Sequence, residues 1–474
     1  MFELHHLTAQ EQWDWLRRGD VTPRELAQHH LDRVARLDPG LGAFVTVTAE
    51  RALERADTLL AGGRSPAPLW GLPLADKDLW DRAGVPTGSG SRLSRGRVPT
   101  TSDEVVRDLD TAGSVSLGKT ATPEFGLTGY TESRLGPPTR TPYDPTRGAG
   151  GSSGGAAAAV AAGLVPFAPG SDGGGSIRIP ASATGLVGLK PSRGRVRSGS
   201  GATSLGGLAV VGTLARTVAD AAMLLDALVS PDGLPVRPHQ ALSAPPSPDG
   251  AYLGTAVRGE GRYQLGVTTA SPWDDTYDVR VDPRVRGVLD DAVRVLDELG
   301  HGVDEAPMPV GDYGRLFRTL WQASAAGIPA GTEDELALLE PVTRWLVGRG
   351  RALGARELGA TLAGLAAHER TVVEAFAPFD AVLTPTLAQL PPPVGWYDAE
   401  DAERAFEQQC LVSPFTSFVN VAGLPAVSLP VGEVDGVPVG VQLVGRPGRE
   451  DVLLAIGAQL ERRLRWQRRH PAGW

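Results

Sequence analysis

The spacing of apolar residues predicts helices in the first sixty residues of the chain. Thr22, Pro23 and Glu25 form a capping box with proline at the first helical position, which marks the start of a helix. An apolar stripe follows at helical spacing, made of Leu26, Leu31, Val34 and Leu37. The triplet at residues 38–40, Asp-Pro-Gly, predicts the end of this helix, and residues 48–60 predict the next one.

Short apolar runs alternate with helical stretches over most of the remaining chain. The runs that predict strands are 72–75, 115–117, 381–383, 426–429 and 439–444. Helical patterns cover residues 103–111, 156–162, 282–299 and 450–464, and recur at intervals between 341 and 377. The stretch 231–261 is rich in Pro, Gly and Ser and predicts irregular structure. The alternation of strands and helices indicates an α/β fold.

Composition excludes several classes of protein. The chain has 474 residues, of which 41% are hydrophobic and 21% charged, so it can bury a sizeable core and is neither disordered nor fibrous. The net charge is -9, and the only dense run of arginines lies in the last dozen residues. Nucleic-acid binding needs a basic surface, so we expect no nucleic-acid partner.

Neither a membrane segment nor a metal site is predicted. The sequence has no apolar stretch of bilayer-spanning length and no secretory signal, so we expect a cytoplasmic protein. The single cysteine, Cys410, excludes an intrachain disulfide framework and is predicted to be packed in the core. The paired histidines at 5–6 and 29–30 lack the i, i+4 spacing of helical metal ligands, so we expect no metal and no cofactor.

Lysine usage points to a specific chemistry. Only Lys77, Lys119 and Lys190 are lysines, whereas the other 43 basic residues are arginines. A buried lysine can lose its proton and arginine cannot, so a general base is one role that arginine is unable to fill.

Two catalytic motifs match by letter and are interpreted as accidental. Residues 113–120 fit the phosphate-loop pattern GxxxxGK[ST], but the alternation within them predicts a strand, and Pro123 follows too closely for a helix. Residues 150–154 fit the nucleophile-elbow pattern GxSxG, but the preceding residues 141–147 are typical of a loop rather than a buried strand.

Two Gly/Ser clusters suggest a serine hydrolase without histidine. They span residues 150–155 and 171–178, and Ser176 follows Ser152 by 24 positions. A serine directly after three glycines can gather backbone N–H groups near its own hydroxyl, because glycine adopts the tight dihedrals of such a nest. Two serines and a lysine can supply a nucleophile, a relay and a base.

These clusters resemble the core of the amidase signature family. The resemblance extends to flanking motifs over nearly the whole chain, at residues 72–78, 118–125, 147–155, 171–178, 188–192, 212–220, 383–386, 420–425 and 440–444. It implies one twisted mixed sheet of about eleven strands, covered by helices on both faces. The expected organisation is an N-terminal helical segment (1–65) on a signature domain (66–474), with core motifs in 70–220, a divergent pocket region in 231–410 and C-terminal strands and a helix in 411–474.

The resemblance also assigns roles to residues. It implies that Ser176 is the nucleophile, that Ser152 bridges after a cis peptide from Gly151, and that Lys77 is the base. The oxyanion hole is expected from the backbone amides of Gly173, Gly174, Gly175 and Ser176. Expected supporting residues are an Asp172 and Arg178 pair that braces the loop, Ser153 as a loop anchor or helix cap, and Lys119 and Lys190 as structural groups.

The base must be neutral to accept a proton, which constrains its surroundings. An ordinary lysine is almost fully protonated at neutral pH, so burial has to lower the pKa of Lys77. The chain departs from the family at Asp76, where Val is common, as it does at Ala149 and Gly173. If this segment is extended, Asp76 and Asp78 point away from Lys77 and leave its pKa low.

The expected activity is hydrolysis of a carboxylic amide through an acyl-enzyme on Ser176. The substrate is expected to be a small apolar, aryl or linear or cyclic oligoamide, and the partners are limited to this small molecule and a second copy in a homodimer. The alternatives are a carbamate or ester hydrolase, a glutaminase subunit of a transamidation complex, and an inactive scaffold. The residues expected to line the pocket are Thr128, Gly129, Tyr130, Trp321 and Phe418; further candidate aromatics are Phe317, Trp345, Trp396 and Tyr397.

Overall fold

The computed structural model of the chain describes residues 3–196, 204–229, 242 and 252–474. Its helices are α1 (Ala9–Arg18), α2 (Pro23–Leu41), α3 (Ala49–Ala61), α4 (Glu104–Thr111), α5 (Gly154–Ala161), α6 (Arg178–Thr184), α7 (Val218–Leu228), α8 (Leu253–Arg258), α9 (Pro283–Glu298), α10 (Tyr313–Ala325), α11 (Glu333–Leu338), α12 (Pro341–Arg351), α13 (Ala355–Phe376), α14 (Ala402–Val412), α15 (Ser417–Val421) and α16 (Glu450–Leu464). Most of the stretch predicted to be irregular, 231–261, lies outside the described residues; α8 near its end corrects that prediction.

The central element is an eight-stranded mixed sheet in the order β10-β9-β11-β13-β12-β7-β8-β6. Its strands are β6 (Phe167–Asp172), β7 (Val187–Lys190), β8 (Val210–Ala215), β9 (Gln264–Val267), β10 (Gly302–Glu305), β11 (Ala381–Pro385), β12 (Ala426–Val434) and β13 (Val437–Gly445). β9 pairs in parallel with β10 and β11, and the other pairs are antiparallel. The predicted α/β class is therefore confirmed.

Two smaller sheets lie beside the central one. β1 (Phe44–Val47), β2 (Pro73–Lys77) and β3 (Val115–Thr120) form a three-stranded sheet in the order β1-β3-β2, and β4 (Arg140–Thr141) and β5 (Asp144–Gly148) form a ribbon. The strands expected in one continuous sheet are thus divided between a sheet of eight and a sheet of three. β2 packs against β6, so the two sheets meet beside the end of β2.

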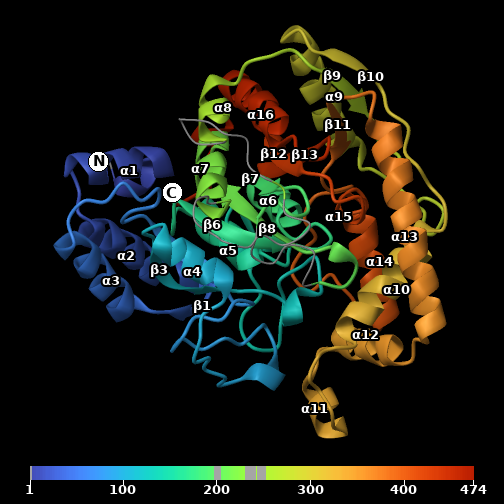
Figure 1. Cartoon of the computed structure of the whole chain (residues 1–474), viewed down its shortest axis with the longest axis horizontal. Coiled ribbons are helices and arrows are strands. Elements are labelled where there is room, and N and C mark those ends of the chain that lie inside the picture. Colours follow the sequence, from blue (N-terminus) through green and yellow to red (C-terminus); the bar gives the residue numbers. More distant parts are fainter. Residues whose placement is uncertain (1–2, 197–203, 230–241, 243–251) are drawn as a thin grey trace.

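Helices cover both faces of the central sheet, as expected (Figure 1). Side chains alternate between the faces of a strand, so Val427 and Leu443 pack with α7, α9 and α16 in one core, whereas their neighbours Ala426 and Val444 pack with α13 and α15 in another. Figure 1 shows α10, α12, α13 and α14 as an orange layer at one side of the molecule. This layer supplies most of the walls of the cavity beside Ser176.

The N-terminal helices follow their predicted start signals but not every predicted end. Thr22 caps α2 and exchanges reciprocal hydrogen bonds with Glu25, as the capping box requires. The helix passes Pro39 and ends at Leu41, with Gly42 in the left-handed conformation at φ 64°. The prediction that residues 38–40 end the helix is wrong by one turn, because the carboxylate of Asp38 instead accepts from the amides of Ala43 and Phe44 beyond the helix.

No helix among the described parts of the chain combines the length and the apolar character that crossing a bilayer requires.

Candidate active site

Lys77 is the last residue of β2 and is completely buried. Its Nζ lies 2.7 Å from Oγ of Ser152, 2.9 Å from Oγ of Ser153 and 3.0 Å from Oγ of Ser171. Three hydroxyls therefore surround the amine. The contacts to Ser153 and Ser171 were not predicted, and nothing in the local sequence distinguishes Ser171 from an ordinary strand residue.

Burial lowers the pKa of Lys77 to about 7, and the negative charge of Asp172 opposes this shift. The two adjacent carboxylates have other cationic partners. Asp76 accepts from Arg82 at 2.6 Å, and Asp78 lies 3.1 Å from the Nζ of Lys119. The structure therefore places both carboxylates away from the amine of Lys77, as the extended backbone of β2 predicts.

The peptide bond between Gly151 and Ser152 is cis, as the family resemblance predicts. The residues before it are not all loop, because Asp144–Gly148 form β5, so the loop prediction for 141–147 is wrong in part. β5 belongs to a partly exposed ribbon and is not the buried strand that a nucleophile elbow needs. Ser153 precedes α5 without capping it through its side chain, which contacts Lys77 instead.

Ser176 lies in the turn between β6 and α6, next to the serines around Lys77. Its backbone carbonyl accepts a hydrogen bond of 3.1 Å from the amide of Ser153, which ties the two Gly/Ser loops together. Within the described residues, no hydrogen bond joins the hydroxyls of Ser152 and Ser176. The structure thus forms the Lys77–Ser152 half of the expected relay, and the second half belongs to the proposed function. Catalytic hydrogen bonds often tighten only when substrate is bound.

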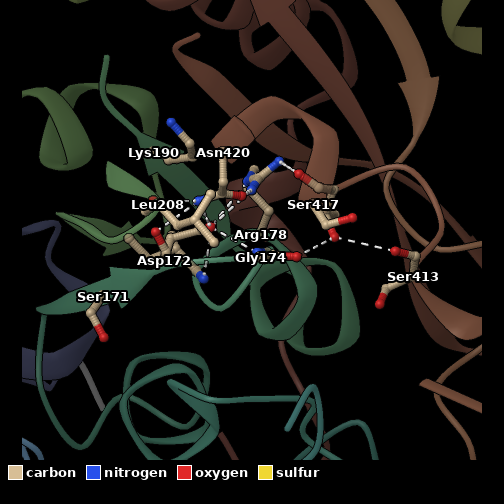
Figure 2. Close-up of polar contacts among 12 residues, drawn as sticks. Ser171, Asp172, Gly174, Arg178, Lys190, Leu208, Ser413, Ser417 and Asn420 are labelled. Carbon is tan, nitrogen blue, oxygen red and sulfur yellow. Dashed lines mark hydrogen bonds and ion pairs between the residues drawn. The ribbon is translucent and has the colours of Figure 1, made fainter. Parts of the chain in front are cut away.

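A buried ion pair holds the Ser176 loop in place (Figure 2). Arg178 donates to Asp172 from Nε at 3.0 Å and from a terminal nitrogen at 2.8 Å, and both side chains are fully buried. The Arg178 charge holds the pKa of Asp172 well below its usual range against the effect of burial. Asp172 in turn accepts from the amides of Gly175 at 2.7 Å and Ile177 at 3.1 Å. Asp172 therefore fixes the backbone on both sides of Ser176.

The same contact corrects the expected oxyanion hole. The amide of Gly175 is already bonded to Asp172, so the candidate donors are reduced to Gly173, Gly174 and Ser176. Gly175 has φ +127°, and a Cβ there would lie 2.4 Å from Oγ1 of Thr416. Glycine is required at this position by backbone conformation and by space.

Residues from the C-terminal third of the chain complete this network. Asn420 donates to the carboxylate of Asp172 at 2.9 Å and accepts from Arg178 at 2.7 Å, and Gln442 accepts from Arg178 at 2.6 Å. Thr416 donates to the carbonyl of Gly174 at 2.7 Å. Asn420 and Gln442 belong to motifs that the sequence singled out, but their contact with the Ser176 loop could not be read from a separation of more than 200 residues.

Arg178→Met is expected to destabilise the protein by about 3–5 kcal/mol, because it leaves Asp172 as an uncompensated buried charge. Urea unfolding of both proteins measures this difference. The matched control is Arg280→Met, which breaks an exposed ion pair with Asp278 and should leave the unfolding midpoint unchanged. A loss below about 1 kcal/mol in Arg178→Met would show that the pair does not brace the loop.

Ser176 opens into a narrow cavity of about 50 Å³. Aromatic side chains from different parts of the chain form its walls: Trp273, Phe317 and Trp321 of α10, and Phe406 of α14. Further lining residues are Leu127, Thr128, Gly129, Gly174, Ile179, Gln409, Cys410, Ser413 and Ser417. None of these residues carries a formal charge at neutral pH, because burial raises the pKa of the Cys410 thiol.

The structure confirms only part of the expected pocket. Thr128, Gly129 and Trp321 line the cavity with Ser176. Phe418 is fully buried in the core, where its ring meets Phe376 edge to face, so it does not line the cavity. Tyr130 stacks on Tyr397 with ring centroids 3.8 Å apart and faces a neighbouring cavity. Helical spacing cannot separate a pocket aromatic from a core aromatic.

That neighbouring cavity has a volume of about 260 Å³ and shares Thr128 with the first. Its acidic lining residues are Glu124, Glu132, Glu340 and Asp398. Its only basic lining residue within the described chain, Arg134, is paired with Glu340 at 3.2 Å. The space beside the Ser176 cavity is therefore acidic.

The remaining two lysines have structural contacts. Lys119 donates to the carbonyl of Trp80 at 2.7 Å and to Thr87, and Lys190 donates to the carbonyls of Pro191 and Leu424. The phosphate-loop string that includes Lys119 is the strand β3 with no helix after it, so its interpretation as an accidental match is consistent with the structure.

Comparisons with known proteins agree with this fold. The family model described as Amidase matches residues 25–454. One of the subunits of the glutamyl-tRNA(Gln) amidotransferase of Moorella thermoacetica is 34% identical over 99% of both chains. Among solved structures, 6-aminohexanoate cyclic dimer hydrolase in complex with substrate has a TM-score of 0.88 at 31% identity, with 99% of each chain covered.

A further solved structure carries the family's name. A bacterial aryl acylamidase of the amidase signature enzymes superposes with a TM-score of 0.87 at 27% identity, with 99% of each chain covered. The family model and these matches extend over nearly the whole chain. The chain therefore belongs to the amidase signature family, whose members are hydrolases that act on carbon–nitrogen bonds.

Proposed function

We propose that this chain hydrolyses small neutral amides with an apolar or aryl group, including oligoamides, through an acyl-enzyme on Ser176. The observation that carries the proposal is the fully buried amine of Lys77, which has three serine hydroxyls around it and no carboxylate paired with it in the described chain. A neutral amine in this position is a general base. The uncharged cavity beside Ser176 sets the kind of substrate.

In the proposed reaction, Ser152 carries protons between Ser176 and Lys77. The oxygen of Ser176 attacks the amide carbon while its proton passes to Ser152, whose own proton passes to the neutral amine of Lys77. When the C–N bond breaks, the leaving nitrogen takes a proton from Ser152, and the ammonium of Lys77 restores it. Water then attacks the ester on Ser176 by the same proton path and releases the acid.

The negative oxygen of the intermediate needs donors that are already in place. Gly173 and Gly174 have no side chains to shield their amides, and Gly174 is held through its carbonyl by Thr416. With the amide of Ser176, these groups are the candidate oxyanion donors, and each such donor typically contributes about 3 kcal/mol to the transition state.

The cavity favours neutral substrates over glutamine. Free glutamine carries an ammonium and a carboxylate, and burying either without a partner is costly. No described residue lining the Ser176 cavity offers an opposite charge, and the acidic cavity next to it would repel the carboxylate. The names of two structural neighbours, an aryl acylamidase and a cyclic dimer hydrolase, point the same way. Carbamates and esters use the same nucleophile and remain part of the test.

A substrate panel tests this proposal. Purified protein should cleave neutral aryl amides with a kcat/KM at least about 1000-fold above that for glutamine, a margin typical of sites that lack partners for a polar substrate. Trp321→Ala should lower kcat/KM for aryl amides by about 30-fold, because an aromatic wall contributes roughly 2 kcal/mol of apolar contact. Acetamide, which is too small to touch that wall, should change by less than about threefold.

Trp396→Ala is the matched control, because Trp396 is a partly exposed tryptophan outside the cavity. It should leave the whole panel unchanged. Preferential hydrolysis of glutamine would favour the glutaminase alternative, and preference for esters or carbamates over every amide would reassign the substrate class without changing the proposed nucleophile.

A further inference from the structure

A cluster of metal-ligating side chains lies at the N-terminal end of the molecule, in elements that the reaction does not use. Nδ1 of His5 lies 3.2 Å from Nε2 of His29 and 3.3 Å from Oε2 of Glu3. All three atoms are within 4.8 Å of one another. Glu3 and His5 come from the segment around the short 3-10 helix at Leu4–His6, whereas His29 comes from α2.

These separations fit a tetrahedral ion. With zinc–nitrogen and zinc–oxygen bonds of about 2.0–2.1 Å, neighbouring ligand atoms of a tetrahedron are about 3.3–3.4 Å apart. The two His5 contacts match this edge length closely. Metal sites with three protein ligands leave the fourth position to a solvent molecule.

We propose that Glu3, His5 and His29 bind a divalent transition-metal ion of the zinc type, which links the N-terminal segment to α2. Sequence spacing gave no indication of this site, because the histidines occur as adjacent pairs. The fold brings one member of each pair together across 24 residues.

The state of the ligands supports binding. His5 is almost fully buried, and burial together with the charges of Arg33 and neighbouring groups lowers its pKa to about 3, so its ring is neutral at physiological pH. Burial also lowers the pKa of His29. A metal needs neutral imidazoles, so no proton has to be displaced from a charged ring.

The surrounding groups leave the carboxylate available. Arg33 hydrogen-bonds to the carbonyls of Ala162 and Gly163 and approaches Glu3 only to 3.9 Å, and the Glu3 side chain is partly exposed. Arg33 and Arg216 bring positive charge near the site, which the Glu3 carboxylate offsets. Binding would replace the 3.2 Å hydrogen bond from the His5 amide to His29.

The site would tie together parts that are distant in sequence. The ring of His5 packs edge to face on the C-terminal Trp474, with centroids 5.2 Å apart, and Figure 1 shows the chain ends on the same side of the molecule. A metal linking His5 to α2 would therefore stabilise the meeting point of both ends.

Cobalt(II) titration of the full chain, purified without a histidine tag and first treated with EDTA, tests the site. We expect saturable uptake of about one ion per chain with the visible absorption of tetrahedral cobalt, lost on adding zinc. Glu3→Gln and His29→Gln should each weaken binding by at least about tenfold. Because Glu3 is partly exposed, its variant should fold normally.

His470→Gln is the control, since His470 is an imidazole stacked on Trp474 but outside the proposed ligands. It should bind cobalt within about twofold of the wild type. The proposal is overturned if the wild type shows no saturable uptake or no tetrahedral absorption, or if Glu3→Gln and His29→Gln bind as the wild type does. Amide hydrolysis is not expected to depend on the ion, so neither result bears on the proposed function.

Discussion

Replacing Ser176 with alanine is expected to lower kcat for amide hydrolysis by at least about four orders of magnitude, the loss typical when a nucleophile is removed from a serine hydrolase. Its turn between β6 and α6 is fixed by Asp172, and its position at the cavity makes it the group that a substrate carbonyl would meet. The variant should also fail to react with a fluorophosphonate, whereas the wild type should gain one phosphonyl group by mass spectrometry.

Ser413→Ala is the matched control for this prediction. Ser413 lines the same cavity, but its hydroxyl donates to the carbonyl of Gln409 in α14. The control should be labelled like the wild type and keep its kcat within about tenfold. Equal activity or equal labelling of Ser176→Ala would mean that another group attacks the substrate. No reaction of folded wild type with any probe or substrate would favour the inactive-scaffold alternative.

Lys77→Met should lower kcat by about 1000-fold or more, because it removes the base and leaves Ser152 without a proton acceptor. The wild type should show a matching dependence on pH. Its folded-state pKa is lowered to about 7, so the amine is neutral above that pH and charged below it. Activity should therefore rise as pH increases through about 7 and fall by about tenfold per unit below it.

Lys190→Met is the control for the pH profile. Burial also lowers the pKa of Lys190 to about 7, but its amine donates to two backbone carbonyls and touches no serine of the site. Folded Lys190→Met should keep the wild-type inflection. A wild-type rate that stays constant between about pH 5 and pH 9 would contradict the role proposed for Lys77.

Elements with strong local signals could be predicted well from the sequence. α16 begins at Glu450 and ends at Leu464 as expected, because acidic residues at its start and arginines at its end suit the helix dipole. The end of α2 could not be predicted, since Pro39 loses one amide donor yet fits within the last turn. Whether strands join one sheet or two depends on long-range pairing, which no local pattern contains.

The candidate site divides in the same way. The Lys77 strand and the two Gly/Ser loops carry their signals in short segments, and the structure brings Lys77 and Ser152 into contact. The alternation of β2 also predicts that Asp76 and Asp78 turn away. In contrast, the walls of the cavity come from α10, α14 and Trp273, and an aromatic residue on a helix has the same pattern whether it faces core or cavity. Phe418 and Tyr130 were misplaced for this reason.

The central claim is that the amine at position 77 is neutral at working pH, and NMR of the protein labelled only in its lysine side chains measures this most directly. The chain has only three lysines, so each signal can be assigned through Lys77→Met and Lys190→Met. We predict that the signal missing from Lys77→Met titrates near pH 7. If that signal instead keeps the shift of a charged amine up to about pH 10, the usual value for lysine, Lys77 is not the base.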